Sequence, residues 1–385
     1  MLNERDARRA LAWLVEAADP RVENLVASSG AVEAVELLSR SSNKNTWTRR
    51  LAAFDHQQAK QAEAAVQARF VIPGDEDWPD SLCDLRQCPA VQNLSGEPLG
   101  LWVRGRGHLA ELGQHSVALV GSRAATAYGE RTAAEIAAEL ADQGVTIVSG
   151  GAYGIDAAAH RGALAAGGAT VAFLAGGLSE FYPKGNVALL TQVMESGLVI
   201  SEYPPDENPT RVRFLARNRL IAALAKATVI VEGSFRSGAR NTVTWATALG
   251  RPVGAVPGPV THSTTATPHR LIREAEAILV TSATDVLELV RPVGEVVARR
   301  PACERLLDTL TPAQKAVQEA LPRRGSRSAG EIALRSGLGM PKTLAALDEL
   351  AEWGLARPHA DGGWGLGEVR NRPSLSIDAR ASPAR

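Results

Sequence analysis

The chain has 385 residues, of which 45% are hydrophobic and 22% are charged, and its 42 lysines and arginines balance 42 aspartates and glutamates. The length excludes a mini-protein and predicts about two to four domains, and the composition is ordinary for a soluble globular protein. The net charge of zero identifies no partner, and it counts against a nucleic-acid binder unless positive charge gathers locally.

The three cysteines, Cys83, Cys88 and Cys303, show neither a paired zinc spacing nor a disulfide framework, which suits a reducing cytoplasm. The first residues lack the apolar core of a signal peptide, and no run of about 18 apolar residues is present to cross a membrane. We therefore expect a cytoplasmic protein with no structural metal and no membrane contact.

Residues 1–68 are rich in alanine and show helical spacing, as in Leu11, Leu14 and Val15. Asp19-Pro20 and Ser28–Gly30 divide the region into short helices. The pattern predicts a small helical domain, similar either to a SAM-like or helix-hairpin-helix module or to a plain packing domain.

Residues 69–290 form the second predicted domain, in which short apolar runs alternate with helix-length amphipathic segments from residue 116 onward. This alternation predicts an α/β fold, a Rossmann-like doubly wound sheet whose strands are mostly parallel. The predicted strands are Val117–Val120, Val145–Val148, Thr170–Leu174, Leu198–Ile200, Thr228–Val231 and Val253–Val256.

The C-terminal part begins with a predicted linker over residues 291–307. Residues 308–368 then suggest three helices, the first capped at Thr311-Pro312, and a small hairpin with its turn at Gly362-Gly363. This arrangement resembles a winged helix. Residues 369–385 combine prolines, serines and charges and are expected to be disordered.

Glycines follow five of the predicted strands, at the edge of a parallel sheet where ligands bind. A single glycine there usually reflects a tight turn, but the set favours close backbone approach to phosphate, helped by the helix N-termini that follow. The glycines concerned are Gly121, Gly150, Gly151, Gly154, Gly176 and Gly238.

Several chemistries are disfavoured by the motifs. Gly121–Thr126 is not the dinucleotide fingerprint G-x-G-x-x-G, and no G-x-x-x-x-G-K-[ST] loop is present, which argues against a dehydrogenase and a nucleoside triphosphatase. Asp156 and His160 are four residues apart, but a capping Asp and a packed His are favoured over a metal pair. Glu202 and Glu232 remain the candidate catalytic carboxylates.

Four arginines surround Phe214 within residues 210–221, namely Arg211, Arg213, Arg217 and Arg219. Cations beside a ring are what single-strand binding requires, because the cations contact the backbone while a base stacks on the ring. Two interpretations stay open at this point: such a binding surface, or a buried Phe214 with arginines on a solvated face. Lys184 adds a further cation near the same sheet edge.

From about residue 70 to 290, the chain resembles the DNA-processing protein A family (DprA, also called Smf). The motifs that carry the resemblance, in the family's order, are Val120–Arg123; Ser149–Ala152 with Gly154–Asp156 and His160; Tyr182-Pro183 with Asn186; Ile200–Pro204; Phe214 with Arg217–Arg219 and Ile221; Val231-Glu232 with Ser237-Gly238; and Gly250-Arg251 with Val256–Gly258.

The resemblance implies a cytoplasmic protein that binds single-stranded DNA on an extended Rossmann fold, forms a homodimer, and helps load the RecA recombinase during natural transformation. It implies neither catalysis nor a cofactor. The residues it assigns to DNA are Gly121, Ser122 and Arg123 as the main phosphate contact, Lys184 and Asn186 as a second, and Arg211, Phe214, Arg217 and Asn218 as the strand channel; Gly150, Gly151, Gly154, Gly176, Arg219, Ser237 and Gly238 complete the expected site.

The chain departs from the family at Leu215, where a proline is usual, and around Pro268–Arg270, where a Gly-x-Asn pattern is missing. Acidic residues beside Lys342 in the third C-terminal helix favour a protein contact over a DNA groove. Two alternatives to a DNA-binding mediator are a nucleoside-monophosphate phosphoribohydrolase on a related fold and a nucleotide sensor that signals through the C-terminal unit.

Overall fold

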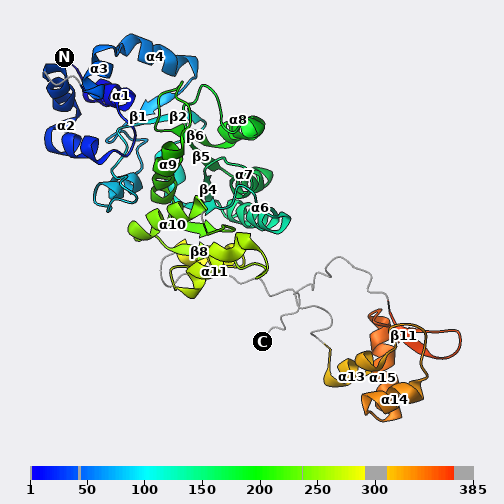
Figure 1. The fold of residues 1–385 in the computed structure, drawn as a ribbon. Helices are drawn as coiled ribbons and strands as arrows, with labels where there is room; N and C mark the ends of the chain where they lie inside the picture. Colours follow the sequence, from blue (N-terminus) through cyan, green and yellow to red (C-terminus); the bar gives the residue numbers. More distant parts are fainter. Residues whose placement is uncertain (1, 42–44, 236, 291–309, 368–385) are drawn as a thin grey trace, which may run out of the picture. The chain divides into compact units, whose positions relative to one another are not determined.

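The computed structural model describes residues 2–41, 45–235, 237–290 and 310–367. The chain forms two compact units, Met1–Ala298 and Arg299–Arg385 (Figure 1). The predicted linker and the predicted disordered tail lie outside the described residues. Among the helices of the described ranges, none combines the length and the apolar character needed to cross a membrane.

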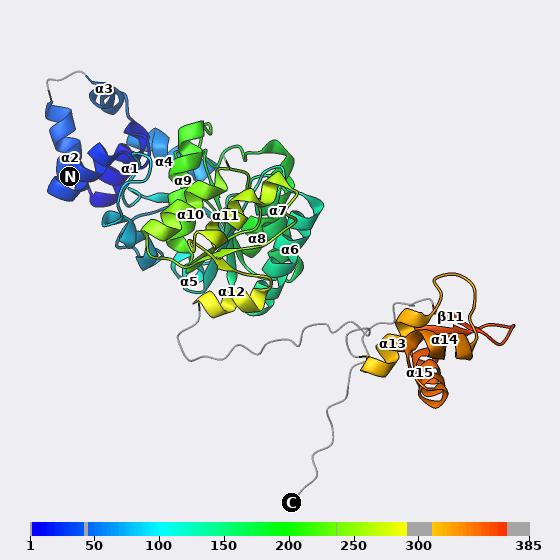
Figure 2. The ribbon, with the colours of Figure 1, turned by 60° about the horizontal axis from the view of Figure 1, so that its bottom comes forward.

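Four helices precede the sheet, α1 (Glu4–Leu14), α2 (Pro20–Arg40), α3 (Thr46–Ala52) and α4 (His56–Ala65). Each begins after an Asn or Asp whose side chain accepts a hydrogen bond from a backbone N–H of the first turn. Leu11 and Leu14 of α1 pack with Ala31 and Val35 of α2. These helices lie at one end of the first unit (Figure 2). They agree with the predicted helical pattern, whereas the likeness to a SAM-like module stays a prediction.

One nine-stranded sheet organises the first unit, in the order β1-β2-β6-β5-β4-β3-β7-β8-β9. In this spatial order, all strands from β6 to β9 run parallel to one another, including β5, β4, β3, β7 and β8. Strand β2 is antiparallel to both of its neighbours, β1 and β6. The bounds are β1 (Arg69–Val71), β2 (Leu101–Gly105), β3 (Ser116–Val120), β4 (Thr146–Ser149), β5 (Thr170–Leu174), β6 (Leu198–Ser201), β7 (Ala227–Ile230), β8 (Val253–Ala255) and β9 (Ile278–Leu279).

The six predicted strands correspond to β3 through β8, so the predicted mostly parallel α/β sheet is confirmed. Three strands were not predicted. β1 and β9 have only three and two residues, too few to show a period, and β2 lies before residue 116, where the alternation of apolar runs and amphipathic segments begins.

Helices cover both faces of the sheet (Figure 1). Successive side chains of each strand point to opposite faces, so each strand supplies apolar side chains to both layers of helices. Val117 and Leu119 of β3 pack on one face, and Ala118 and Val120 pack on the other. The first face carries α6 (Ala127–Asp142), α7 (Ile155–Ala165), α8 (Val187–Ser196) and α12 (Ala283–Val290), and the second carries α9 (Arg211–Leu224), α10 (Ala239–Ala248) and α11 (Ala266–Arg273).

The remaining short helices of this unit are η1 (Asp80–Arg86), α5 (Leu109–Gln114), η2 (Lys184–Asn186) and η3 (Ser263–Thr265). After β6 the chain passes through α9 and returns on the far side of β3 as β7. The strand order therefore reverses between β3 and β7. In an open α/β sheet this switch point leaves a crevice beyond the carboxyl ends of the strands.

The second unit contains α13 (Pro312–Ala320), α14 (Ala329–Ser336), α15 (Met340–Glu352) and a hairpin of β10 (Ala356–Pro358) and β11 (Trp364–Leu366). Thr311 and Ser328 start α13 and α14 with complete capping boxes. The three predicted helices and the hairpin are present, and the winged-helix assignment stays a prediction.

Candidate nucleic-acid interface

A groove of about 920 Å³ opens at the switch point, above the carboxyl ends of β3 and β7. We call this cavity the switch-point groove. Three segments supply the predicted residues that line it: the loop after β3, the first half of α9, and the loop before α10. These residues are Gly121, Ser122 and Arg123; Arg211, Phe214, Arg217 and Asn218; and Ser237 and Gly238.

Aromatic rings and guanidinium groups meet inside this groove. The Arg123 guanidinium lies 4.4 Å from the centroid of the Phe214 ring, and the Arg217 guanidinium lies 6.0 Å from it. The Tyr182 ring lies 5.8 Å from the same ring, at an angle of 59°. Cation–π attraction holds the arginine charges next to the rings. The groove thus presents positive charge beside flat apolar surfaces.

Arg217 is buried, and it fastens α9 to the ends of two strands. Its Nη1 donates to the carbonyl of Gly150 at 2.6 Å and to that of Phe173 at 2.5 Å. Burial, with a contribution from the charge of Arg123, lowers the pKa of Arg217 to about 10, whereas Asp156 opposes the shift. The group stays protonated at neutral pH, so Arg217 adds positive potential at the groove.

A chain of amide side chains borders the groove on another side. Asn218 Nδ2 donates to Asn241 Oδ1 at 3.1 Å, and Asn241 Nδ2 donates to Gln92 Oε1 at 3.3 Å. All three residues line the groove. Amides of this kind offer donors and acceptors to a polar ligand edge.

The glycines allow the loops of the site to pack tightly. Gly154 has a φ of +72°, and a Cβ there would lie 2.3 Å from the Ser122 carbonyl oxygen. A Cβ on Gly121 would lie 2.5 Å from the Ile155 side chain. The Ser122 N–H donates to the Glu232 carbonyl at 2.8 Å. These loops therefore hold each other in place, and the Ser122 amide is already used internally.

The structure contradicts the inclusion of Arg219 in the DNA site. Arg219 is fully buried, and its two terminal nitrogens donate to the Glu202 carboxylate at 2.6 and 2.7 Å. Positions two apart on an α-helix point in nearly opposite directions. Arg217 and Arg219 consequently face different surroundings, which a count of arginines in the sequence cannot show.

Other predicted residues also lie outside the groove lining. Asn186 is buried and donates to the Gly151 carbonyl at 2.9 Å. A Cβ on Gly176 would lie 2.9 Å from the Glu207 carbonyl oxygen, so this glycine serves packing. Lys184 is exposed in η2, two residues after Tyr182. The predicted residues that do not line the groove are Gly150, Gly151, Gly154, Gly176, Lys184, Asn186 and Arg219.

The candidate catalytic carboxylates have internal partners. Glu232 is fully buried and accepts hydrogen bonds from the N–H and the hydroxyl of Thr126 at 2.9 and 2.6 Å. Glu202 forms the ion pair with Arg219. Neither residue lines the switch-point groove.

His160 is a packed residue of α7. Its Nδ1 lies 2.7 Å from the Thr170 hydroxyl, and burial lowers its pKa to about 3. Within the described ranges, no group of three or more His, Cys, Asp or Glu residues could hold a metal ion.

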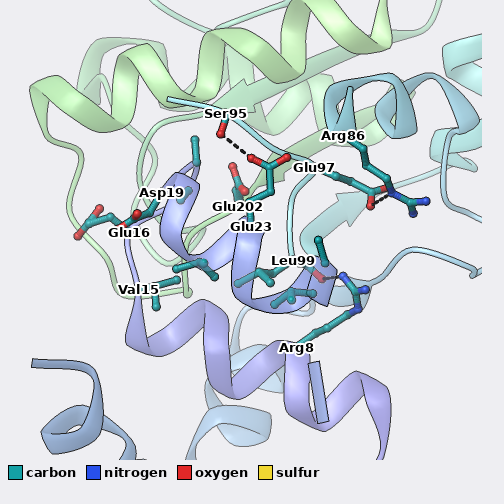
Figure 3. Close-up of a pocket in the computed structure, with 15 residues that line it drawn as sticks. Arg8, Val15, Glu16, Asp19, Glu23, Arg86, Ser95, Glu97, Leu99 and Glu202 are labelled. Carbon is teal, nitrogen blue, oxygen red and sulfur yellow. Dashed lines mark hydrogen bonds and ion pairs between the residues drawn. The ribbon is translucent and has the colours of Figure 1, made fainter. Parts of the chain in front are cut away.

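A second cavity, of about 450 Å³, lies between the turn that joins α1 to α2 and the segment that precedes β2. Figure 3 shows carboxylates of Glu16, Glu23 and Glu202 around it, with Ser95 donating to Glu23. Glu97 also lines the cavity and pairs with Arg86 at 2.7 Å. An excess of carboxylates repels phosphate, so this cavity does not extend the cationic groove.

The fold and the groove define a doubly wound, Rossmann-like α/β protein with a cationic and aromatic site at its switch point. The family described as DNA recombination-mediator protein A matches residues 69–291. The chain belongs to this family, the DprA/Smf family. Its relatives include the DNA processing protein DprA of Mycobacterium tuberculosis, with 44% identity over 92% of this chain and 93% of the relative.

Two further relatives match smaller shares of this chain. Protein Smf of Escherichia coli is 39% identical over 52% of this chain and 53% of its own length. A solved structure of DNA processing protein A from Streptococcus pneumoniae has a TM-score of 0.63 and 29% identity, covering 76% of this chain and 99% of that chain.

Proposed function

We propose that this protein binds single-stranded DNA in the switch-point groove and acts as a recombination mediator without catalysis. The observation that carries the proposal is the cluster of Arg123, Phe214 and Tyr182 inside the groove. Guanidinium groups pair with phosphate, and exposed rings stack on bases whose faces are free. In a duplex these faces are already stacked, so the cluster favours a single strand.

Arg211 and Lys184 extend the positive charge beyond the cluster. Arg211 is exposed at the first position of α9 and lines the groove, and Lys184 is exposed in the segment that follows Tyr182. We expect these two side chains to contact successive phosphates of one strand.

Fluorescence anisotropy with a labelled oligothymidylate and with a hairpin duplex tests the proposal. We expect tighter binding of the single strand, and an affinity about tenfold lower for Arg123→Ala because one charge-assisted contact is lost. The slope of log affinity against log salt should decrease by about 0.7 for that variant. Lys184→Ala should act in the same direction.

Arg131→Ala is the matched control, since Arg131 is exposed on α6 and does not line the groove. It should bind the single strand like the unaltered protein. No single-strand binding, or equal affinities for Arg123→Ala and Arg131→Ala, would refute the proposal.

We also infer that the protein forms a homodimer and delivers RecA to the bound strand, as the resemblance implies. The exposed β9 edge of the sheet supports the first inference, and family membership supports the second. A pull-down of RecA by this protein on single-stranded DNA, compared with each protein on the DNA alone, tests the delivery. RecA retention independent of this protein would contradict it.

A further inference from the structure

Phe235 is an exposed aromatic residue in the loop between β7 and α10, with 69% of its surface accessible. The protein has only six phenylalanines, and a large apolar side chain gains nothing from exposure to water. An exposed ring beside a binding groove is a recurrent feature of contact sites.

Phe235 stands where two hollows meet. It lines the switch-point groove, and with Ser234 it also lines an adjoining hollow of about 620 Å³. The far side of this hollow is formed by the loop after β8, where Val260 is 89% exposed. The groove that contains Phe214 therefore continues past Phe235 toward Val260.

Hydrogen bonds with Thr264 and Thr267, which lie just before α11 and within it, hold the backbone that precedes Phe235. The Thr267 hydroxyl donates to the Ser234 carbonyl at 2.8 Å, and the Thr267 N–H donates to the Gly233 carbonyl at 2.9 Å. The Gly233 N–H donates to the Thr264 carbonyl at 2.5 Å. A platform presented by an anchored loop loses little conformational freedom when a ligand binds.

The charges around Phe235 suit a polyanion with flat rings. The Arg270 guanidinium lies 5.9 Å from the centroid of the Phe235 ring, and Arg240 also lines the switch-point groove. Both arginines have acidic neighbours, Glu274 at 3.3 Å and Glu276 at 2.7 Å respectively, so they add local rather than large positive potential.

We propose that Phe235 is a second stacking platform for the strand that occupies the switch-point groove. A nucleobase several positions away from the one at Phe214 stacks on the Phe235 ring and enters the hollow toward Val260. This inference rests on the proposed function. Continuity with the groove and the flanking arginines favour a nucleobase over an apolar protein segment as the occupant.

The test compares oligothymidylates of increasing length on the full-length protein. One stacked base contributes about 5- to 150-fold in affinity. We expect Phe235→Ala to bind the shortest binding oligonucleotides like the unaltered protein, and to bind longer ones about tenfold more weakly. Phe235→Tyr should restore the affinity, because it keeps an aromatic face.

Two controls separate this inference from the proposed function. Phe214→Ala should weaken binding at every length, whereas Trp353→Ala, which removes an exposed aromatic of the second unit, should change nothing. If Phe214→Ala and Arg123→Ala both bind the oligothymidylates like the unaltered protein, the proposed function is overturned. If those two variants bind DNA more weakly but Phe235→Ala binds every length like the unaltered protein, only the second platform is overturned.

A direct readout uses Phe235→p-azidophenylalanine and an end-labelled oligothymidylate. Irradiation should crosslink the strand to position 235 when the oligonucleotide is long and not when it is short. Crosslinks to a protein partner without crosslinks to any length of DNA would also overturn the second platform.

Discussion

Two arginines of α9, Arg217 and Arg219, are both buried and use their charge in different ways. Arg217 holds two strand-end carbonyls and lies under the groove. Arg219 neutralises Glu202, and its Nε donates to the Gly96 carbonyl at 3.1 Å. A buried charge without its partner is costly, so Arg219 contributes to folding rather than to DNA contact.

Arg219→Met is expected to lower the free energy of unfolding by about 3 kcal/mol or more, because it leaves the Glu202 carboxylate buried and unpaired. Urea unfolding followed by tryptophan fluorescence measures this change. Single-strand affinity, measured without urea, should stay close to that of the unaltered protein.

Arg211→Met on the same helix is the matched control. Arg211 is exposed, so its removal should weaken DNA binding and leave the unfolding midpoint nearly unchanged. If Arg211→Met lowers the unfolding midpoint and only Arg219→Met lowers the single-strand affinity, both assignments are reversed.

At the scale of elements, α9 links the N-terminal helices to the groove. Arg213, near the start of α9, donates to the Glu16 carboxylate at 2.8 and 2.9 Å and to Glu207 at 2.6 Å. Glu16 lies between α1 and α2, and Phe214 is the next residue after Arg213. The N-terminal helices therefore brace the turn that presents the groove phenylalanine.

A double-mutant cycle with Arg213→Gln and Glu16→Gln should give a coupling free energy of about 0.5–1 kcal/mol, since Glu16 is half exposed and the pair is partly screened. In hydrogen exchange, the first turn of α9 should exchange faster in either variant. The exposed pair Arg40 and Glu36 on α2 is the control, and its coupling should be smaller. Equal couplings would show that the brace does not exist.

For the molecule as a whole, β9 is the last strand of the sheet among the described residues, and within them it pairs only with β8. Ile278 and Leu279 of β9 are 58% and 48% exposed. An exposed apolar edge strand is a surface that another chain can cover. The homodimer that we infer would bury it.

Light scattering after size-exclusion chromatography tests this arrangement. We expect Ile278→Lys with Leu279→Lys to convert the dimer to a monomer, because two charges would be buried without partners at the interface. Leu37→Lys, on the exposed side of α2, should leave the mass unchanged. A dimer that persists in the double variant would place the interface elsewhere.

The parts of this protein that depend on local pattern could be predicted from the amino-acid sequence. Alternating apolar runs located β3 through β8 and the parallel sheet, because strand and helix periods follow from backbone geometry. The glycine-rich loop at Gly121 was found because ligands bind where parallel strands end. The Arg-Phe segment around Phe214 was found because cations beside a ring are typical of single-strand binding.

Which side chain faces which partner became known from the three-dimensional arrangement of the elements. Arg217 and Arg219 look alike in sequence, yet one lies beneath the groove and the other pairs with Glu202. The exposure of Phe235 had no sequence signal, since it depends on how the loops after β7 and β8 pack. Burial and charge pairing are set by contacts between residues distant in the chain, and no local period records them.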